Sequence, residues 1–266
     1  MKLGVIGCGK MGTALVEGAI RSGAVAAADV TGVDPYQSAR DHFAKATGAR
    51  VTADISDLAG CEVVLLCTKP LDVRSALGEI SKSSAGSPLL VIPIAAGITI
   101  SALELAAAGH IRVVRAMPNT PALVGKGAAA YCLGNLATSE DGEIARQLLE
   151  AVGLAVAVPE RLMDAVTGLS GSGPAYVYMI IEALADGGVC VGLPRADALR
   201  LAAQTVLGAA TVVLETGEHP AVLKDMVTSP GGTTIAGLAE LERRGLRSAM
   251  IDAVGAASRK ATELGK

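Results

Sequence analysis

The sequence predicts an α/β domain followed by an all-helical domain. Up to about residue 160, short runs of β-branched and aliphatic residues alternate with longer helical patterns. This alternation is typical of βαβ units that build a parallel sheet. After Pro159 the strand-like runs stop, and helical patterns continue to the C-terminus. We therefore expect two domains, residues 1–160 and residues 161–266.

The strands of the first domain are expected where short aliphatic runs lack polar alternation, because helices then cover both faces of the sheet. These runs are residues 3–6, 30–33, 63–67, 89–92, 112–115 and 155–158. A helix is expected from residue 13 to residue 21, directly after the first strand.

The helices of the second domain are expected at residues 161–169, 175–191, 195–215, 220–227, 234–244 and 246–264. The stretch 175–191 carries only Glu182 and Asp186 as charges, so it is apolar on nearly every side. A helix of this kind in so small a domain predicts burial against a second subunit, and hence a homodimer.

Composition and charge exclude several classes of protein. With 51% hydrophobic and 18% charged residues, the chain buries too much apolar surface to be disordered. The net charge of -3 gives no positive field for nucleic acid, and 2% aromatic residues offer few rings for base stacking. The apolar stretches are shorter than the ~20 residues of a membrane-spanning helix. We expect neither a nucleic acid nor a membrane as partner.

The cysteines and histidines predict no metal site. The five cysteines and three histidines are scattered, and none has the spacing of zinc ligands. The chain also enters its first strand pattern without a charged leader or an apolar signal core. We interpret the cysteines as reduced thiols and expect a cytoplasmic location.

Residues 7–12, Gly-Cys-Gly-Lys-Met-Gly, match the pattern G-x-G-x-x-G between a strand and a helix. In a dinucleotide site, Gly7 would allow a tight turn, Gly9 would admit the pyrophosphate, and Gly12 would allow close packing of helix on strand. The N–H groups of the helix N-terminus would face the phosphates. The alternative is a purely structural βα turn.

Asp34 follows the second expected strand, where a dinucleotide-binding domain places the residue that contacts the ribose. Its carboxylate would accept hydrogen bonds from both ribose hydroxyls and would repel a 2′-phosphate, which favours NADH. Arg40, six residues later, is the nearby cation that would favour NADPH. The alternative is that Asp34 and Pro35 only begin a turn.

Two further kinds of segment are placed to bind ligands. Residues 67–70, Cys-Thr-Lys-Pro, end a strand at the carboxyl edge of the sheet, where their backbone would line the nicotinamide ribose. Residues 169–174 and 229–234 are glycine-rich helix starts. In the second, exposed N–H groups and the hydroxyls of Ser229, Thr233 and Thr234 suit a carboxylate. For each helix start, the alternative is a cap with a tight turn.

Together with the glycine loop, several motifs resemble the pyrroline-5-carboxylate reductase family in order along nearly the whole chain. They are R-A-M-P-N-T-P at 115–121, D-A-V-T-G at 164–168, L-S-G-S-G-P at 169–174, D-G-G at 186–188, G-L-P-R at 192–195 and S-P-G-G-T-T at 229–234. Residues 67–70 take the place of the family's A-V-K-P pattern. The resemblance implies a Rossmann-type domain followed by a helical dimerisation domain. It also implies NAD(P)H-dependent reduction of Δ1-pyrroline-5-carboxylate to L-proline, the last step of proline biosynthesis. Members of the family form dimers, which often assemble into larger rings such as decamers.

The loop, the strand ends and the family motifs give the expected site. The cofactor-binding residues are Ile6, Gly7, Cys8, Gly9, Lys10, Met11, Gly12, Asp34, Cys67, Thr68, Lys69, Pro70 and Asn119. The resemblance implies substrate binding by Ser229, Gly231, Gly232, Thr233 and Thr234, with Thr167 near the reacting carbons. NADPH-using relatives tend to carry a small or basic residue in place of Asp34, so NADP(H) and NAD(H) both stay open.

Two other functions fit the same architecture. A β-hydroxyacid dehydrogenase needs a lysine and an asparagine after its glycine pair, where this chain has Val177 and Ile181. A non-catalytic nucleotide sensor has no need of a second, carboxylate-sized site such as residues 229–234. Reduction of a protonated imine needs no strong base, which agrees with a chain that offers no histidine or lysine at these motifs.

Overall fold

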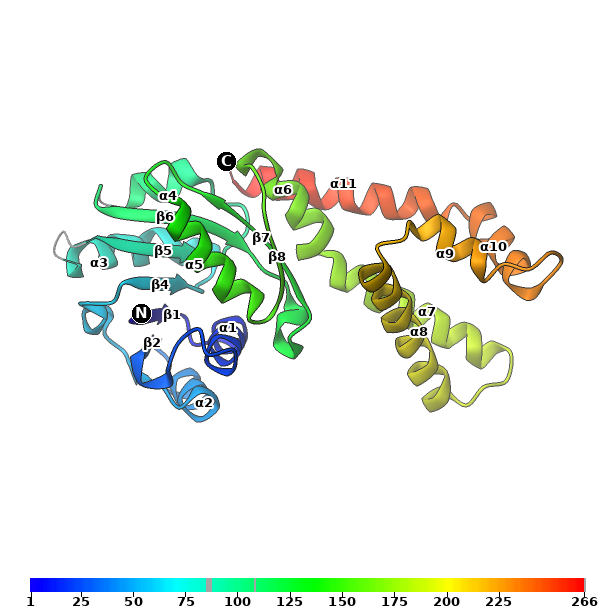
Figure 1. Cartoon of the computed structure of the whole chain (residues 1–266), viewed down its shortest axis with the longest axis horizontal. Helices are drawn as coiled ribbons and strands as arrows, with labels where there is room; N and C mark the ends of the chain where they lie inside the picture. Colours follow the sequence, from blue (N-terminus) through cyan, green and yellow to red (C-terminus); the bar gives the residue numbers. More distant parts are fainter. Residues whose placement is uncertain (85–87, 108, 266) are drawn as a thin grey trace. The chain divides into compact units, whose positions relative to one another are not determined.

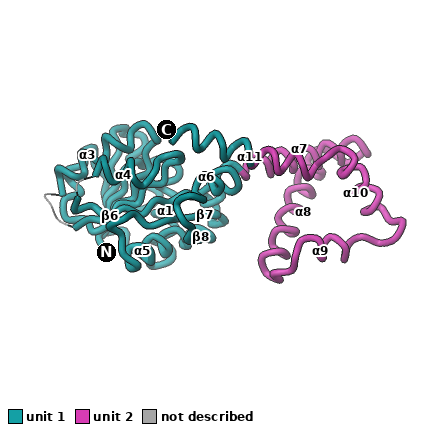
Figure 2. Tube along the Cα trace, turned by 90° about the horizontal axis from the view of Figure 1, so that it is seen from above, with its two compact units in different colours: residues 1–172, 255–266 teal, residues 173–254 magenta. Residues whose placement is uncertain are grey.

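The computed structural model describes residues 1–84, 88–107 and 109–265 (Figure 1). The chain divides into two compact units, which are described separately. Unit 1 comprises residues 1–172 and 255–266, and unit 2 comprises residues 173–254 (Figure 2).

Unit 1 is built on one eight-stranded sheet with the order β3-β2-β1-β4-β5-β6-β7-β8 (Figure 1). The strands are β1 Leu3–Ile6, β2 Val30–Val33, β3 Arg50–Thr52, β4 Val63–Leu66, β5 Leu89–Pro93, β6 Ile111–Met117, β7 Gly127–Leu133 and β8 Gly153–Ala157. All neighbouring strands are parallel except β6 and β7, which are antiparallel. The carboxyl ends of β1, β2 and β4 therefore meet at one edge, which we call the carboxyl edge.

Helices cover both faces of this sheet. The helices of unit 1 before residue 172 are α1 Lys10–Arg21, α2 Gln37–Thr47, α3 Val73–Ser83, α4 Ile100–Ala106, α5 Ser139–Glu150 and α6 Met163–Val166. The short helices are η1 Ala27–Asp29, η2 Ile55–Leu58, η3 Pro70–Asp72, η4 Thr120–Val124, η5 Glu160–Leu162 and the π-helix η6 Thr167–Gly171. Residues of α1, α2 and α5 share one buried core with the sheet, and residues of α3 and α4 share the other. The purely aliphatic strands follow from this double burial.

The expected α/β architecture is confirmed, and two strands were missed. β3 has only three residues, and Arg50 within it is exposed, so its sequence shows little apolar run. β7, Gly-Ala-Ala-Ala-Tyr-Cys-Leu, contains no β-branched residue, and small residues carry a weak strand signal. The sequence of β3 is too short for a clear pattern, and the position of β7 in the sheet makes it a strand despite its small residues.

Unit 2 is helical, as expected. Its helices are α7 Gly173–Cys190, α8 Arg195–Thr216, α9 Pro220–Met226, α10 Thr233–Arg243 and most of α11 Leu246–Leu264. The nearly all-apolar α7 buries only Ala185 within one chain, and its Met179 is 72% exposed. By length and composition alone, α8 is long and apolar enough to cross a membrane, and 11% of its apolar 18-residue stretch is buried. These helices present an apolar surface that one chain leaves uncovered.

The last residues of the chain return to unit 1. α11 begins in unit 2, and from Gly255 onward it belongs to unit 1. There Thr262 Oγ1 donates a hydrogen bond to Asp164 Oδ2 at 2.8 Å. The other carboxylate oxygen of Asp164 lies 3.4 Å from the buried Arg115 guanidinium, which also contacts Glu160 at 3.3 Å. This ion cluster joins β6, η5, α6 and the end of α11. The domain boundary expected at residue 160 stays a prediction.

A second ion pair stabilises the start of α5. Thr138 Oγ1 accepts a hydrogen bond from the Asp141 N–H, and Asp141 Oδ2 accepts one from the Thr138 N–H at 2.8 Å. Arg112 donates to both oxygens of the same carboxylate at 2.8 and 3.0 Å. Burial alone would raise the pKa of Asp141, but Arg112 and Thr138 together lower it.

Replacement of this carboxylate is expected to destabilise the fold in a pH-dependent way. Asp141→Asn loses the charged acceptor of a bidentate pair, so we expect the free energy of unfolding at pH 7 to fall by about 2 kcal/mol. Because the pKa of Asp141 is lowered on folding, its stabilisation is present above about pH 4 and is lost as the pH falls below that value. Urea denaturation across pH 3 to 7 should show the two proteins converging at acid pH.

Glu140→Gln removes a charge from the same helix turn at an exposed position and serves as the control. It should change the unfolding free energy by less than about 0.5 kcal/mol. An Asp141→Asn variant no less stable than this control at pH 7 would contradict the assignment.

Candidate active site

The glycine loop, residues 7–12, packs its backbone directly on the end of β4. Gly7 has φ +98°, and a Cβ atom there would lie 2.7 Å from the Cys67 carbonyl oxygen. A Cβ atom on Gly12 would lie 2.3 Å from the Gly7 carbonyl oxygen. Any side chain at either position would collide with backbone, so both must be glycine.

Gly9 differs from its two neighbours in the motif. A Cβ atom there would meet no atom of the described chain within 4 Å, so the space beside Gly9 is open. Gly9 is also the N-cap of α1, and no side chain accepts a hydrogen bond from the first N–H groups of this helix. Open space in front of free N–H groups at a helix N-terminus is the arrangement that binds phosphate groups.

Asp34 lies at the carboxyl end of β2 and is 8% exposed. Its Oδ2 accepts a hydrogen bond from the Cys8 N–H at 3.0 Å, and its Oδ1 accepts one from the Tyr36 N–H at 2.9 Å. The carboxylate therefore ties the glycine loop to β2. Arg40 donates to the Asp34 carbonyl oxygen at 2.6 Å, so the guanidinium lies beside the same residue.

Residues 67–70 follow β4 at the carboxyl edge, next to the glycine loop. Among the buried side-chain nitrogen and oxygen atoms of the described residues, Thr68 Oγ1 is the one that lacks a hydrogen-bond partner. A buried hydroxyl without a partner costs about 1–3 kcal/mol, so a ligand that pairs with it gains affinity. Lys69 and Pro70 are exposed beside it.

Two thiols of the predicted site have raised pKa values. Burial, together with the charge of Asp34, raises the pKa of the Cys8 thiol to about 12. Burial, with a smaller contribution from Cys8, likewise raises the pKa of the Cys67 thiol to about 12. Both remain protonated at neutral pH, so neither is a nucleophile.

The structure brings the predicted dinucleotide-binding residues together, apart from Asn119, at the ends of β1, β2 and β4. Open space at Gly9, free N–H groups on α1 and the unpaired Thr68 hydroxyl fit a dinucleotide. The glycine loop would hold the pyrophosphate, Asp34 the adenosine ribose, and residues 67–70 the nicotinamide ribose.

Asn119 contacts the π-helix η6, which begins at Thr167, and both residues belong to unit 1. Thr167 begins the π-helix η6, where its hydroxyl donates to the Met163 carbonyl oxygen at 2.9 Å. Asn119 follows β6 and is buried, and its Nδ2 donates to the Ser170 carbonyl oxygen at 2.9 Å. In place of the single helix expected at residues 161–169, the structure has the short α-helix α6 followed by the π-helical turn η6. Pro174, which has no N–H, is the sequence signal for this irregularity.

The predicted substrate residues form one loop of unit 2, residues 229–234. Gly231 has φ +67°, a conformation that favours glycine. A Cβ atom on Gly232 would lie 2.3 Å from Ser229 Oγ, so a side chain there would displace the Ser229 hydroxyl. α10 begins at Thr233, and no side chain caps its first N–H groups. This free helix N-terminus, flanked by hydroxyl groups, suits a carboxylate.

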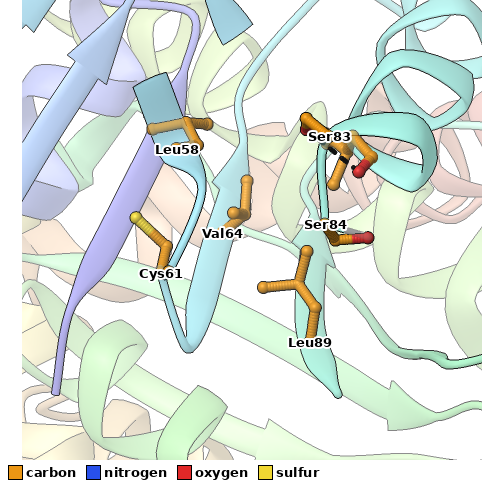
Figure 3. Close-up of a pocket in the computed structure, with 8 residues that line it drawn as sticks. Leu58, Cys61, Val64, Ser83, Ser84 and Leu89 are labelled. Carbon is orange, nitrogen blue, oxygen red and sulfur yellow. Dashed lines mark hydrogen bonds between the residues drawn. The ribbon is translucent and has the colours of Figure 1, made fainter. Parts of the chain in front are cut away.

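A small pocket lies away from these residues. Its volume is about 20 Å³, and Cys61, Val64, Ser84 and Leu89 are among the residues that line it (Figure 3). These residues lie near the starts of β4 and β5, at the edge opposite to the glycine loop. The pocket has room for one water molecule and not for a cofactor.

In the part of the chain that the structure describes, no group of three or more His, Cys, Asp or Glu side chains could hold a metal ion.

Two family models match this chain. Residues 160–264 match a family model described as pyrroline-5-carboxylate reductase dimerisation, and residues 2–97 match one described as NADP oxidoreductase coenzyme F420-dependent. A pyrroline-5-carboxylate reductase of Methanosarcina acetivorans is 48% identical over 100% of this chain and 98% of its own.

Solved structures give the same result over the full length. A pyrroline-5-carboxylate reductase from Coxiella burnetii has a TM-score of 0.94 and 34% identity, covering 100% of this chain and 98% of that one. A Plasmodium falciparum pyrroline carboxylate reductase with NADP bound has a TM-score of 0.88 and 32% identity, with the same coverage. The chain belongs to the pyrroline-5-carboxylate reductase family.

Proposed function

We infer that this chain reduces Δ1-pyrroline-5-carboxylate to L-proline with NAD(P)H, the last step of proline biosynthesis. The observation that carries this inference is similarity to pyrroline-5-carboxylate reductases over the whole length of the chain. The glycine loop with open space at Gly9 and the carboxylate-sized loop at residues 229–234 supply the two sites that the reaction needs.

The protein has to hold two reactants in place, because hydride transfer to a protonated imine needs no strong base. When bound, the dinucleotide supplies the hydride that reduces the C=N bond. The N–H groups of the 229–234 loop would bind the substrate carboxylate, and its hydroxyls would complete the contact. This assignment agrees with the absence of charge on the loop itself.

Thr167 has a defined part in this proposal. Its hydroxyl proton is used in the hydrogen bond to the Met163 carbonyl, so its oxygen is left as an acceptor. An acceptor beside the substrate nitrogen would stabilise the protonated imine, the form that takes the hydride. The product amine would keep the proton on nitrogen.

The cofactor preference depends on Asp34. Residues 2–97 form an NADP(H)-type binding domain by their family match. The Asp34 carboxylate would repel a 2′-phosphate, whereas Arg40 beside it would attract one. The two groups oppose each other, so NADH and NADPH both remain candidates.

The dimerisation domain accounts for the apolar surface of unit 2. We propose that α7 and α8 pack against a second copy of the chain, which would cover residues such as Met179 and Leu201. The apolar character of α8 is then that of an interface helix, not of a membrane span. A larger ring of dimers and a cytoplasmic location are further expectations, the second supported by free thiols at all five cysteines.

The direct test is the rate of absorbance loss at the nicotinamide band with purified protein, Δ1-pyrroline-5-carboxylate, and NADH or NADPH in separate assays. We expect oxidation of at least one cofactor that depends on the substrate. Binding of both cofactors without oxidation of either would favour the sensor. In a separate assay, reduction of NAD+ or NADP+ by a 3-hydroxy acid would favour a β-hydroxyacid dehydrogenase.

Asp34→Ser should shift the preference towards NADPH, because the substitution removes the charge that repels the 2′-phosphate. We expect the ratio of kcat/KM for NADPH to that for NADH to rise about tenfold, which corresponds to about 1.4 kcal/mol. Asp29 is exposed and directly precedes β2, whereas Asp34 follows β2 at its other end. Asp29→Ser therefore removes a charge far from the site and should leave the ratio unchanged. An equal ratio in the two variants would refute the role of Asp34.

Thr234→Ala should weaken substrate binding selectively. Loss of a hydrogen bond to a charged carboxylate costs about 1.5–3 kcal/mol, so we expect the KM for Δ1-pyrroline-5-carboxylate to rise at least about tenfold. The KM for the dinucleotide, measured on the same variant, is the internal control. If both KM values rise equally, the 229–234 loop is not the substrate site.

A further inference from the structure

The side chain of Asn119 does not cap the helix that follows it. Asn119 precedes the short helix η4, and an asparagine there commonly accepts hydrogen bonds from the first N–H groups of the following helix. Here it makes no such bond. Its amide instead reaches two segments that are distant in sequence, at Ala128 and at Ser170.

The first contact replaces a broken strand ladder. In the antiparallel pairing of β6 with β7, Met117 lies opposite Ala130, so the register would place Asn119 opposite Ala128. The ladder ends after Met117, where Pro118 has no N–H to donate. The Ala128 N–H donates to Asn119 Oδ1 at 2.8 Å, so the side chain takes over from the main chain.

The second contact satisfies a carbonyl group that its own helix leaves unpaired. In an α-helix the Ser170 carbonyl would accept from the N–H of residue 174, which is a proline. The helix widens at this point, and the Ser172 N–H donates to the Thr167 carbonyl five residues back, at 2.8 Å. Asn119 Nδ2 donates to the Ser170 carbonyl oxygen at 2.9 Å and supplies the missing partner.

We propose that Asn119 is a positioning residue: it fixes the π-helical turn Thr167–Gly171 against β7 and thereby sets the direction of the Thr167 hydroxyl. Asn119 is 8% exposed, so water does not replace either hydrogen bond. The effect on catalysis rests on the role proposed above for Thr167, whereas the effect on the turn does not.

Asn119→Asp tests this role, since it keeps the acceptor for Ala128 and replaces the donor to Ser170 with an oxygen. Amide hydrogen exchange in peptides covering residues 163–175 should become about tenfold faster. The value of kcat should fall at least about tenfold, while the dissociation constant of NADPH, measured by nicotinamide fluorescence, should stay within twofold. Asn135→Asp makes the same chemical change in an exposed hydrogen bond to Glu104 and should leave all three quantities near wild type.

Two further variants separate the possible outcomes. Pro174→Ala returns an N–H to residue 174, so Asn119→Asp should speed exchange by less than threefold in that background. In a Thr167→Val background, Asn119→Asp should no longer lower kcat. If Asn119→Asp destabilises the chain too far for kinetics, the exchange rates of Pro174→Ala with and without it still give the comparison.

Unchanged exchange at residues 163–175, or a weaker affinity for NADPH with unchanged kcat, would overturn the proposal; the second result would make Asn119 a cofactor ligand. If Thr167→Val alone keeps the wild-type kcat, the role proposed for Thr167 is wrong. The exchange data then still decide whether Asn119 fixes the turn.

Discussion

The contact between backbone and backbone at Gly7 and Cys67 is the constraint on which the carboxyl edge of unit 1 depends. No side chain fits at Gly7 or Gly12, so the glycine loop lies directly on the end of β4. That approach brings residues 67–70 next to the N-terminus of α1. The Asp34 carboxylate then holds the loop to β2 through the Cys8 N–H. Three strand ends thus form one surface because two glycines lack a Cβ atom.

Sequence patterns predicted this edge well because each part has a local signal. The glycine spacing, each aliphatic strand and the aspartate after β2 are each recognised from a few consecutive residues. The helices from residue 173 onward were equally predictable from their apolar residues. The exposed apolar surface of α7 in one chain agrees with a partner subunit as its cover.

The features that were missed depend on contacts distant in sequence. β7 is a strand because β6 and β8 flank it, although its alanines favour no strand. The π-helical turn needs Pro174, which is visible in the sequence, and also the Asn119 amide, which comes from 51 residues before Ser170. The second oxygen of Asp164 pairs with Thr262, 98 residues away. No local periodicity carries such pairings, so they become visible only in the fold.

The return of the last residues to unit 1 has a consequence for synthesis of the chain. Asp164 in α6 has Thr262 as a hydrogen-bond partner. Gly97 packs against Leu264, since a Cβ atom added to Gly97 would lie 3.1 Å from the Leu264 Cβ atom. A ribosome releases the N-terminal residues first, so unit 1 waits through the translation of all of unit 2 for these contacts. A nascent chain that stalls before Gly255 leaves the Arg115 ion cluster without the closing helix. Completion of the core of unit 1 is therefore coupled to the synthesis of residues 255–264, which follow all of unit 2.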